Sequence, residues 1–197
     1  MAVRTVIQAG HPSLKKKNKQ ILNFKSPKLK LLQKDLIDTM HKKSLIGIAA
    51  SPIAQNYMVF VTHPRNTKSR KLERTDKLRL YLNPKITFKS QEESIVYEGC
   101  GSIVKGDLFG PVSRPKEIEI ETRDENGQKF RLRCDGILAR VIQHEYDHLM
   151  GIEFIEKVTD YRKVIIGKYY KEKIRNSKLQ KQNSLITKID YKKLQHS

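Results

Sequence analysis

The segment VIQHEYDHLMG, residues 141 to 151, constrains the fold of this chain more than any other stretch. His144 and His148 are four residues apart, which is about one helical turn, so both imidazoles project from one face of a helix. Asp135 and Gly136 are start signals for that helix. Its apolar stripe consists of Ile137, Leu138, Val141 and Ile142. The chain therefore has to seat a helix bearing two imidazoles on a hydrophobic core.

This histidine pair has a chemical interpretation and a neutral one. An i, i+4 pair can bind one transition metal, and Glu145, turned by about 100° from His144, can reach a water on that metal. A catalytic site of this kind takes three protein ligands and keeps one position open for water. Short patterns also arise by chance, and the two histidines would then lie on a solvent-exposed helix face without binding a metal. The third ligand decides between the two.

Three places in the chain are candidates for that third ligand. The metzincin protease pattern needs a third histidine where this chain has Phe154. Glu153 and Glu156 follow the helix too closely for the gluzincin arrangement, whose third ligand comes from a separate helix. Cys100 lies between two glycines, which permit a tight bend, and its thiolate would complete a Cys-His-His site. The alternative for Cys100, as for Cys134, is a small buried hydrophobe.

The composition limits the class of protein. The chain has 197 residues and is 38% hydrophobic, which suits one domain with one modest core. No run of eighteen apolar residues is present, so no membrane span is expected. The first residues lack the apolar core of a signal peptide. Two cysteines do not make a disulfide scaffold, and a reducing, cytosolic compartment is expected.

The charge of the chain is strongly positive. Its 40 Lys and Arg exceed its 21 Asp and Glu, giving a net charge of +19. The excess lies in the first forty-odd residues, in residues 62–80 and in the tail from Lys157, around a balanced centre. Such a basic shell indicates a polyanionic partner. Because lysine predominates and no aromatic stacking motif is interleaved, weak electrostatic attraction is favoured over specific nucleic-acid recognition.

The order of the expected elements predicts an α+β fold. They are a helix over 26–43, strands over 57–62, 79–88 and 94–102, a hairpin over 116–134, the histidine helix and a second long helix over 160–181. Ser26 and Pro27 suit the start of the first helix. Asn83–Pro84 indicates a turn or bend, and Asn126–Gly127 the hairpin turn. Antiparallel strands followed by helices exclude the alternation of a parallel α/β sheet.

Several motifs together resemble the peptide deformylase family. EGCGS (98–102) and QHEYDH (143–148) are similar to its second and third motifs, and IGIAAS followed by MVFV to its first motif and the next strand. The resemblance covers residues 2–158, and residues 159–197 form a separate basic helix and tail. It implies antiparallel sheets packed around a central HExxH helix, with a C-terminal helix. It also implies that Cys100, His144 and His148 are the metal ligands and that Glu145 is the catalytic acid and base.

The resemblance also implies an activity. It is the removal of the N-formyl group from the initiator methionine of nascent polypeptides, in the cytoplasm of a bacterium. The metal would be ferrous iron, which zinc, nickel or cobalt can replace. The N-formylmethionyl peptide would be the substrate, and the basic C-terminal helix would contact ribosomal RNA. The Gly101 N–H would hold the oxyanion. The peptide strand and methionine pocket would be formed by Ile46, Gly47, Val96 and Val141, for which ordinary core packing is the alternative.

One departure from the family pattern bears on the rate. Pro52 occupies the position of a glutamine that donates a hydrogen bond to the oxyanion, and proline can donate none. Gln55, three residues later, is the nearest replacement in sequence. Loss of one such donor typically slows an enzyme by about 10² to 10³. The sequence therefore predicts a deformylase, slow if Pro52 is uncompensated. The alternative is an impaired paralogue that acts as a ribosome- or RNA-associated binding protein.

Overall fold

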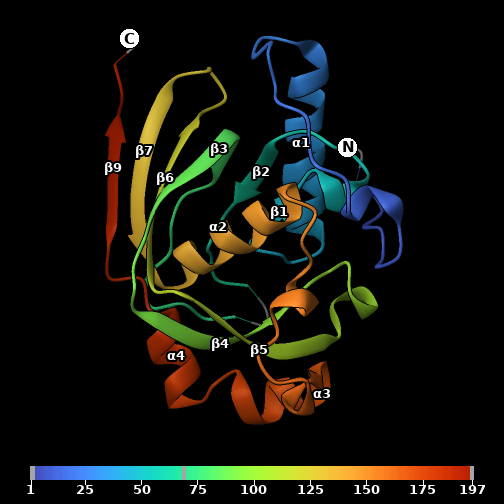
Figure 1. Ribbon diagram of the computed structural model, residues 1–197, viewed down its shortest axis with the longest axis vertical. Coiled ribbons are helices and arrows are strands. Elements are labelled where there is room, and N and C mark those ends of the chain that lie inside the picture. Colours follow the sequence, from blue (N-terminus) through green and yellow to red (C-terminus); the bar gives the residue numbers. More distant parts are fainter. Residues whose placement is uncertain (1–2, 68–69, 196–197) are drawn as a thin grey trace.

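The computed structural model describes residues 3–67 and 70–195. At its centre lies the helix α2 (Gly136–Leu149), in the hollow of a curved sheet (Figure 1). The apolar stripe of α2 faces the core: Leu138 and Ile142 are fully enclosed, Val141 is buried and Ile137 is partly buried. Asp135 stands before the helix but does not cap it. Its carboxylate accepts hydrogen bonds from the N–H groups of Thr187 and Lys188 instead, so it ties the C-terminal segment to the start of α2.

Two antiparallel sheets surround α2, as the α+β prediction required. The larger has the order β1 (Gly47–Ala49), β2 (Val59–Thr62), β3 (Arg79–Lys89), β6 (Glu117–Arg123), β7 (Lys129–Asp135) and β9 (Ile189–Lys193). The smaller has the order β4 (Glu93–Gly99), β5 (Leu108–Pro115) and β8 (Ile165–Ile166). Strands β6 and β7 alternate between buried and half-buried residues, so one face of the predicted hairpin packs on the core.

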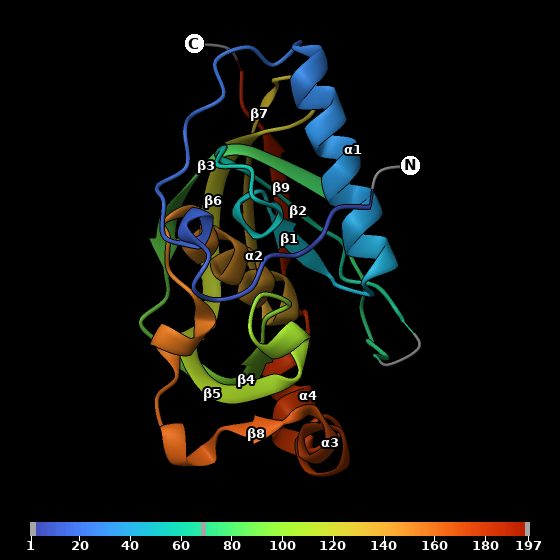
Figure 2. The ribbon, with the colours of Figure 1, turned by 90° about the vertical axis from the view of Figure 1, so that its right-hand side faces the viewer.

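The first predicted helix is α1 (Pro27–Lys42), with Pro27 in its first turn. It lies across β1 and β2 on the face opposite α2 (Figure 2). Leu29, Leu32, Leu36 and Met40 form the buried stripe of α1. They pack with Ile48, Val59 and Val61 in one core cluster, while α2 packs with Ala49, Phe60 and Tyr81 in another. The two faces of the large sheet are thus each covered by one helix.

Strand β3 continues through the position where a turn or bend was expected. The register slips between Leu82 and Lys85, and Asn83 adopts a φ of 49°. The Asn83 side chain accepts a hydrogen bond from the Ile21 N–H and donates one to the Ile21 carbonyl. These bonds hold the left-handed residue in place, so the Asn-Pro signal is a β-bulge rather than a chain reversal.

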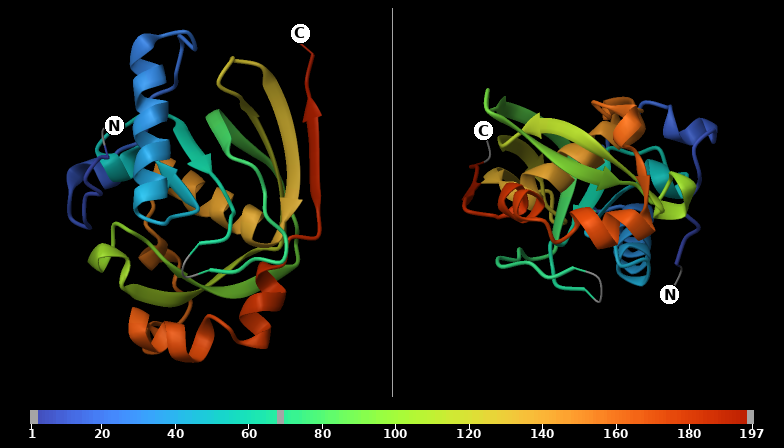
Figure 3. Two further views of the ribbon diagram at one scale, coloured as in Figure 1. Left: turned by 180° about the vertical axis from the view of Figure 1, so that it is seen from behind. Right: turned by 90° about the horizontal axis from the view of Figure 1, so that it is seen from below.

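The single long helix predicted over 160–181 is wrong. The tail contains a short 3₁₀ turn (Tyr161–Lys163), β8, α3 (Gly167–Tyr169), a π-helical turn (Tyr170–Ile174) and α4 (Lys178–Ser184) before β9. The β-branched run Val164, Ile165 and Ile166 favours a strand, which pairs with β5, and Gly167 interrupts helical propensity. The tail passes beneath β4 and β5 and returns beside β7 (Figure 3).

The remaining short elements are 3₁₀ turns: η1 (Pro12–Leu14), η2 (Ser51–Ile53), η3 (Val104–Gly106) and η4 (Phe154–Lys157). Among the described residues, no helix is both long enough and apolar enough to cross a bilayer. The residues that follow 158 add one strand to each sheet, β8 to the smaller and β9 to the larger.

Candidate metal centre

Cys100 is placed by the bend that follows β4. A side chain at Gly99 would meet the ring of Phe109 at 2.7 Å and the Leu108 carbonyl at 2.9 Å, so the strand can approach β5 closely only with glycine there. The bend closes with a 3.0 Å hydrogen bond from the Ile103 N–H to the Cys100 carbonyl. The Ser102 N–H points at the Cys100 sulfur, 3.4 Å away. The thiol is therefore buried and fixed on the side of the bend that faces α2.

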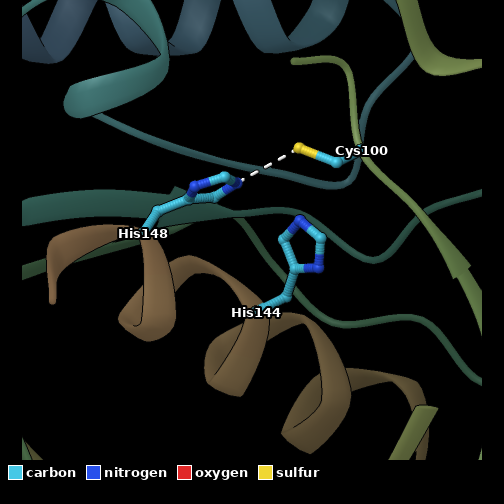
Figure 4. A group of neighbouring side chains, drawn as sticks. All are labelled: Cys100, His144 and His148. Carbon is cyan, nitrogen blue, oxygen red and sulfur yellow. Dashed lines mark hydrogen bonds between the residues drawn. The ribbon is translucent and has the colours of Figure 1, made fainter. Parts of the chain in front are cut away.

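The structure brings Cys100 together with the two histidines (Figure 4). The Cys100 Sγ atom lies 3.2 Å from Nε2 of His148. One ligand atom of each of Cys100, His144 and His148 falls within 4.8 Å of the others. The two imidazole rings are 5.0 Å apart and nearly perpendicular. The third candidate ligand is thus Cys100, from a different part of the chain.

The surroundings favour a thiolate at Cys100. Burial alone would raise the pKa of this thiol, but the adjacent imidazoles of His148 and His144 outweigh it and hold the pKa well below its ordinary value. Nδ1 of His144 lies 3.0 Å from Oε2 of Glu98, which orients the ring. This contact leaves Nε2 of His144 as the nitrogen available to a metal.

Glu98 is the centre of a buried ion network that sequence reasoning missed. Arg114 donates to Oε1 of Glu98 at 2.7 Å and to Asp147 at 2.6 Å, and Arg140 donates to Glu98 at 2.9 Å. Burial would raise the pKa of Glu98, but Arg114 and His144 hold it well below its ordinary value. One feature of the sequence pointed to this network: Arg140 lies four residues before His144, on the same face of the helix. The carboxylate that pairs with Arg140 is Glu98, which is too far away in sequence to be recognised as its partner.

Glu145 lies beneath the backbone of β1. Burial raises the pKa of its carboxyl group above the ordinary value, and the Ala49 backbone N–H offsets part of this effect. A side chain at Gly47 would meet Cγ2 of Val141 at 2.4 Å and Oε1 of Glu145 at 2.8 Å. Because Gly47 has no side chain, β1 can pass close enough to α2 at this position to cover Glu145.

The donor set fits a divalent metal. One sulfur and two imidazole nitrogens are the soft and borderline ligands that zinc, iron, cobalt and nickel accept. Three protein ligands leave a position for water or substrate. Nδ1 of His148 is buried with no hydrogen-bond partner among the described residues, so only its Nε2 is directed at a neighbour.

Cys134, which was expected to be a buried hydrophobe, lies in the main core.

A cavity of about 790 Å³ opens beside the three ligands. It lies between β1 and β4, which are edge strands of their sheets, with α2 below them. The residues predicted to touch substrate all line this cavity: Ile46, Gly47, Val96, Gly101, Val141 and Glu145. Val141 packs in the core as well as lining the cavity, and contact with substrate stays a prediction for it.

The resemblance drew attention to two positions, Pro52 and Gly101, as bearing on an oxyanion. Pro52 lies in η2 and lines the cavity, whereas Gln55, the replacement considered from sequence, is not among the lining residues. Within the described chain, the Gly101 N–H makes no hydrogen bond, while the Gly101 carbonyl accepts one from the Gln8 side chain at 2.9 Å. The Gly101 carbonyl is thus held by Gln8, while the Gly101 N–H has no hydrogen-bond partner among the described residues.

Comparisons with known proteins give one consistent result. Residues 3–164 match the family model described as polypeptide deformylase. A peptide deformylase from Pseudothermotoga lettingae is 34% identical over 89% of this chain and 94% of its own length. A class I type b peptide deformylase from Acinetobacter baumannii superposes with a TM-score of 0.76 at 26% identity, covering 81% of this chain and 100% of that one. The A. baumannii protein was also solved with Met-Ala-Ser bound, and that structure has a TM-score of 0.72.

Proposed function

The chain belongs to the polypeptide deformylase family, and from this premise we propose which of its residues carry out the family's reaction. The protein is a peptide deformylase, a metal-dependent hydrolase that removes the formyl group from the initiator methionine of nascent polypeptides. No finding favours the alternative of an impaired binding protein. Each step of this reaction needs a group that can reach the cavity beside the three candidate ligands.

We propose that Cys100, His144 and His148 hold one metal ion. The observation that carries this assignment is the convergence of their ligand atoms within 4.8 Å in a buried site. A divalent cation there would acidify a water molecule and polarise the formyl oxygen. Ferrous iron is the proposed native ion, with zinc, nickel or cobalt as substitutes, since thiolate and imidazole ligands suit all four. A reducing cytosol keeps the two free cysteines and ferrous iron in the required state.

Glu145 is the proposed proton carrier. It follows His144 directly, lines the cavity and lies against Gly47 of β1. As water adds to the formyl carbon, Glu145 accepts its proton and then delivers a proton to the amine as the carbon–nitrogen bond breaks. The products are formate and a peptide with a free amino terminus. The Gly101 N–H is the proposed donor to the developing oxyanion.

The two edge strands provide a binding mode for the peptide. An extended peptide can add to an exposed sheet edge through its backbone groups, and the edge of β1 at Ile46 and Gly47 faces the cavity. The apolar side chains of Val96 and Val141 then accommodate the methionine side chain. Met-Ala-Ser bound to the A. baumannii enzyme supports a short peptide that begins with methionine as the ligand.

The test is formate release by the metal-loaded protein. Protein purified without oxygen is expected to contain one metal per chain and to release formate from a formyl-methionyl tripeptide. Cys100→Ser is expected to lose most of the bound metal and the activity. Cys134→Ser, a change at the buried cysteine outside the site, is the matched control and should keep its metal. Metal-loaded wild-type protein that releases no formate would contradict the assignment.

For the domains, we propose that residues 1–158 carry the catalysis and that the basic segment 159–197 contacts ribosomal RNA. Lys171 and Lys173 are exposed on the tail, which supports an electrostatic contact. The test is co-sedimentation of full-length protein with ribosomes at increasing salt. Replacement of both lysines by glutamine should weaken binding, while Lys30→Gln/Lys34→Gln on α1 should not. Equal binding by both variants would contradict the proposed contact.

A further inference from the structure

The mouth of the active-site cavity has a cationic rim that the deformylase reaction does not use. Two segments form it, the loop around residues 70–74 and the tail from residue 175 onward. The cations that line the cavity here are Arg70, Lys71, Arg74, Arg175 and Lys181, against a single rim carboxylate, Glu73. In the described part of the chain, no ion pair involves any of these five cations. The rim therefore carries an uncompensated positive charge.

The tail half of this rim is fixed in place. The Gln180 side chain accepts a hydrogen bond from the Tyr97 N–H at 3.1 Å and donates one to the Tyr97 carbonyl at 3.2 Å. Asn183 donates to the Ile95 carbonyl at 3.2 Å. These bonds attach α4 to the free edge of β4, where the two lie side by side (Figure 1). This wall lies beyond residue 164, where the match to the family model ends.

Arg175 is oriented by aromatic contacts. Its guanidinium lies 5.2 Å from the centre of the Tyr170 ring, which stacks at 4.0 Å on Phe109 of β5. The facing loop is tied to the tail by a 2.8 Å hydrogen bond from Arg74 to the Thr187 carbonyl. The loop and the tail are thus joined to each other, and their cations face one cavity.

Arg70 has no anionic partner in the described chain, although it is half-buried. Burial and the nearby charges of Arg175 and Arg65 lower the pKa of Arg70. Arg70 and Arg175 line the same cavity, so their like charges repel each other there, and a partly buried charge is costly unless it is paired. An anion bound between Arg70 and Arg175 would reduce the repulsion between the two guanidinium groups and would pair the partly buried charge of Arg70.

We propose that Arg70 and Arg175 form an anion subsite that recognises an acidic side chain in the first few residues after formyl-methionine. This specificity rests on the proposed function, because the cations line the same cavity as the metal ligands and the edge of β1, along which the peptide is proposed to lie. Single-stranded RNA is the less suitable occupant. Tyr170, the aromatic ring beside Arg175, is buried against Phe109 and gives no exposed face for a base.

The test compares two matched peptides. Formyl-Met-Ala-Glu-amide and formyl-Met-Ala-Gln-amide differ by one charge and have no terminal carboxylate. Wild-type enzyme is expected to prefer the glutamate peptide in kcat/KM by about three- to tenfold at low salt, mainly through KM, with the preference falling as salt rises. Arg70→Gln/Arg175→Gln should abolish the preference. Lys30→Gln/Lys34→Gln, which removes two charges from the far face of the sheet, should retain it.

A second measurement separates this proposal from the activity itself. Binding of the unformylated Met-Ala-Glu-amide and Met-Ala-Gln-amide to full-length protein needs no turnover, and the glutamate peptide should bind more tightly by the same factor. If no formate is released yet this difference persists, the deformylase assignment fails and the subsite stands. Equal kcat/KM and equal binding for the two peptides, or a preference that survives the double substitution, would overturn the subsite. So would a double variant that alters only the affinity for a single-stranded RNA oligonucleotide.

Discussion

At the scale of single residues, the site depends on positions where a side chain is absent or replaced. Gly47 and Gly101 both line the cavity, but for different reasons. A side chain at Gly47 would collide with Val141 and Glu145, whereas one at Gly101 would meet nothing closer than 3.6 Å. Pro52 stands where the family resemblance led us to expect a donor, and proline has no N–H to donate. These three positions give two predictions.

Gly47→Ala should destabilise the protein and disturb Glu145. The added methyl would lie 2.4 Å from Val141 and 2.8 Å from the Glu145 carboxylate, so β1 has to move off α2. Overpacking of this kind typically costs about 1 to 3 kcal/mol of unfolding free energy. Urea denaturation measures it, with Gly101→Ala as the control that should stay within about 0.5 kcal/mol. Equal stability of the two variants would show that β1 does not approach α2 this closely.

Pro52→Gln should raise kcat. The glutamine would supply a side-chain donor from the cavity wall, and one oxyanion donor is typically worth about 10² to 10³ in rate. Formate release by iron-loaded protein measures the effect. Pro52→Ala restores the backbone N–H but adds no side-chain amide, so any rise in kcat in this variant would come from the backbone. An unchanged kcat in Pro52→Gln would mean that another group already fills this role.

At the scale of elements, the parts with strong periodicity were predictable. The four-residue histidine spacing predicted α2, and alternation around Asn126–Gly127 predicted the β6–β7 hairpin. The tail was not predictable because lysines hide its apolar pattern and its strands form only by pairing with β5 and β7. Cys100 was predictable from its glycine-flanked motif. The Glu98 network was not, since its arginines come from two other elements.

Glu98→Gln should weaken both the fold and the metal site. The change removes the carboxylate that joins β4 to β5 and α2, and it leaves Arg114 and Arg140 buried with less compensation. Breaking a buried pair costs about 3 to 5 kcal/mol, and losing a histidine's orienting partner costs about 10- to 100-fold in metal affinity. Thermal unfolding and metal titration measure the two effects.

The control for this change lies on the same strand. Glu93→Gln alters an exposed residue of β4 that hydrogen-bonds Ser113, and it should leave metal affinity unchanged. If Glu98→Gln bound metal as tightly as Glu93→Gln does, the proposed orientation of His144 by Glu98 would be wrong.

At the scale of the whole molecule, the tail is part of the fold rather than an appendage. It supplies β8 and β9, and Ile186 is buried in the main core beside α2. The same segment brings cations to the cavity mouth in a chain with a net charge of +19. The tail therefore contributes both to the stability of the fold and to the proposed preference for acidic peptides.

Ile186→Ala should accordingly destabilise the entire domain. Ile186 is 3% exposed, and truncation of a buried isoleucine typically costs about 2 to 5 kcal/mol. Leu179→Ala, at a tail residue that is 65% exposed, is the control and should have little effect. A urea titration followed by far-UV circular dichroism should show one cooperative transition shifted to lower urea. A change confined to a small early transition would mean that the tail unfolds independently.

The central claim is that one sulfur and two imidazoles from Cys100, His144 and His148 bind a single metal. X-ray absorption spectroscopy of the iron- or cobalt-loaded protein tests it most directly, because it reports the identity and number of the ligand atoms. The account predicts one sulfur and two histidine nitrogens, with the sulfur signal lost in Cys100→Ser and kept in Cys134→Ser. A spectrum without sulfur in the wild-type protein would contradict it.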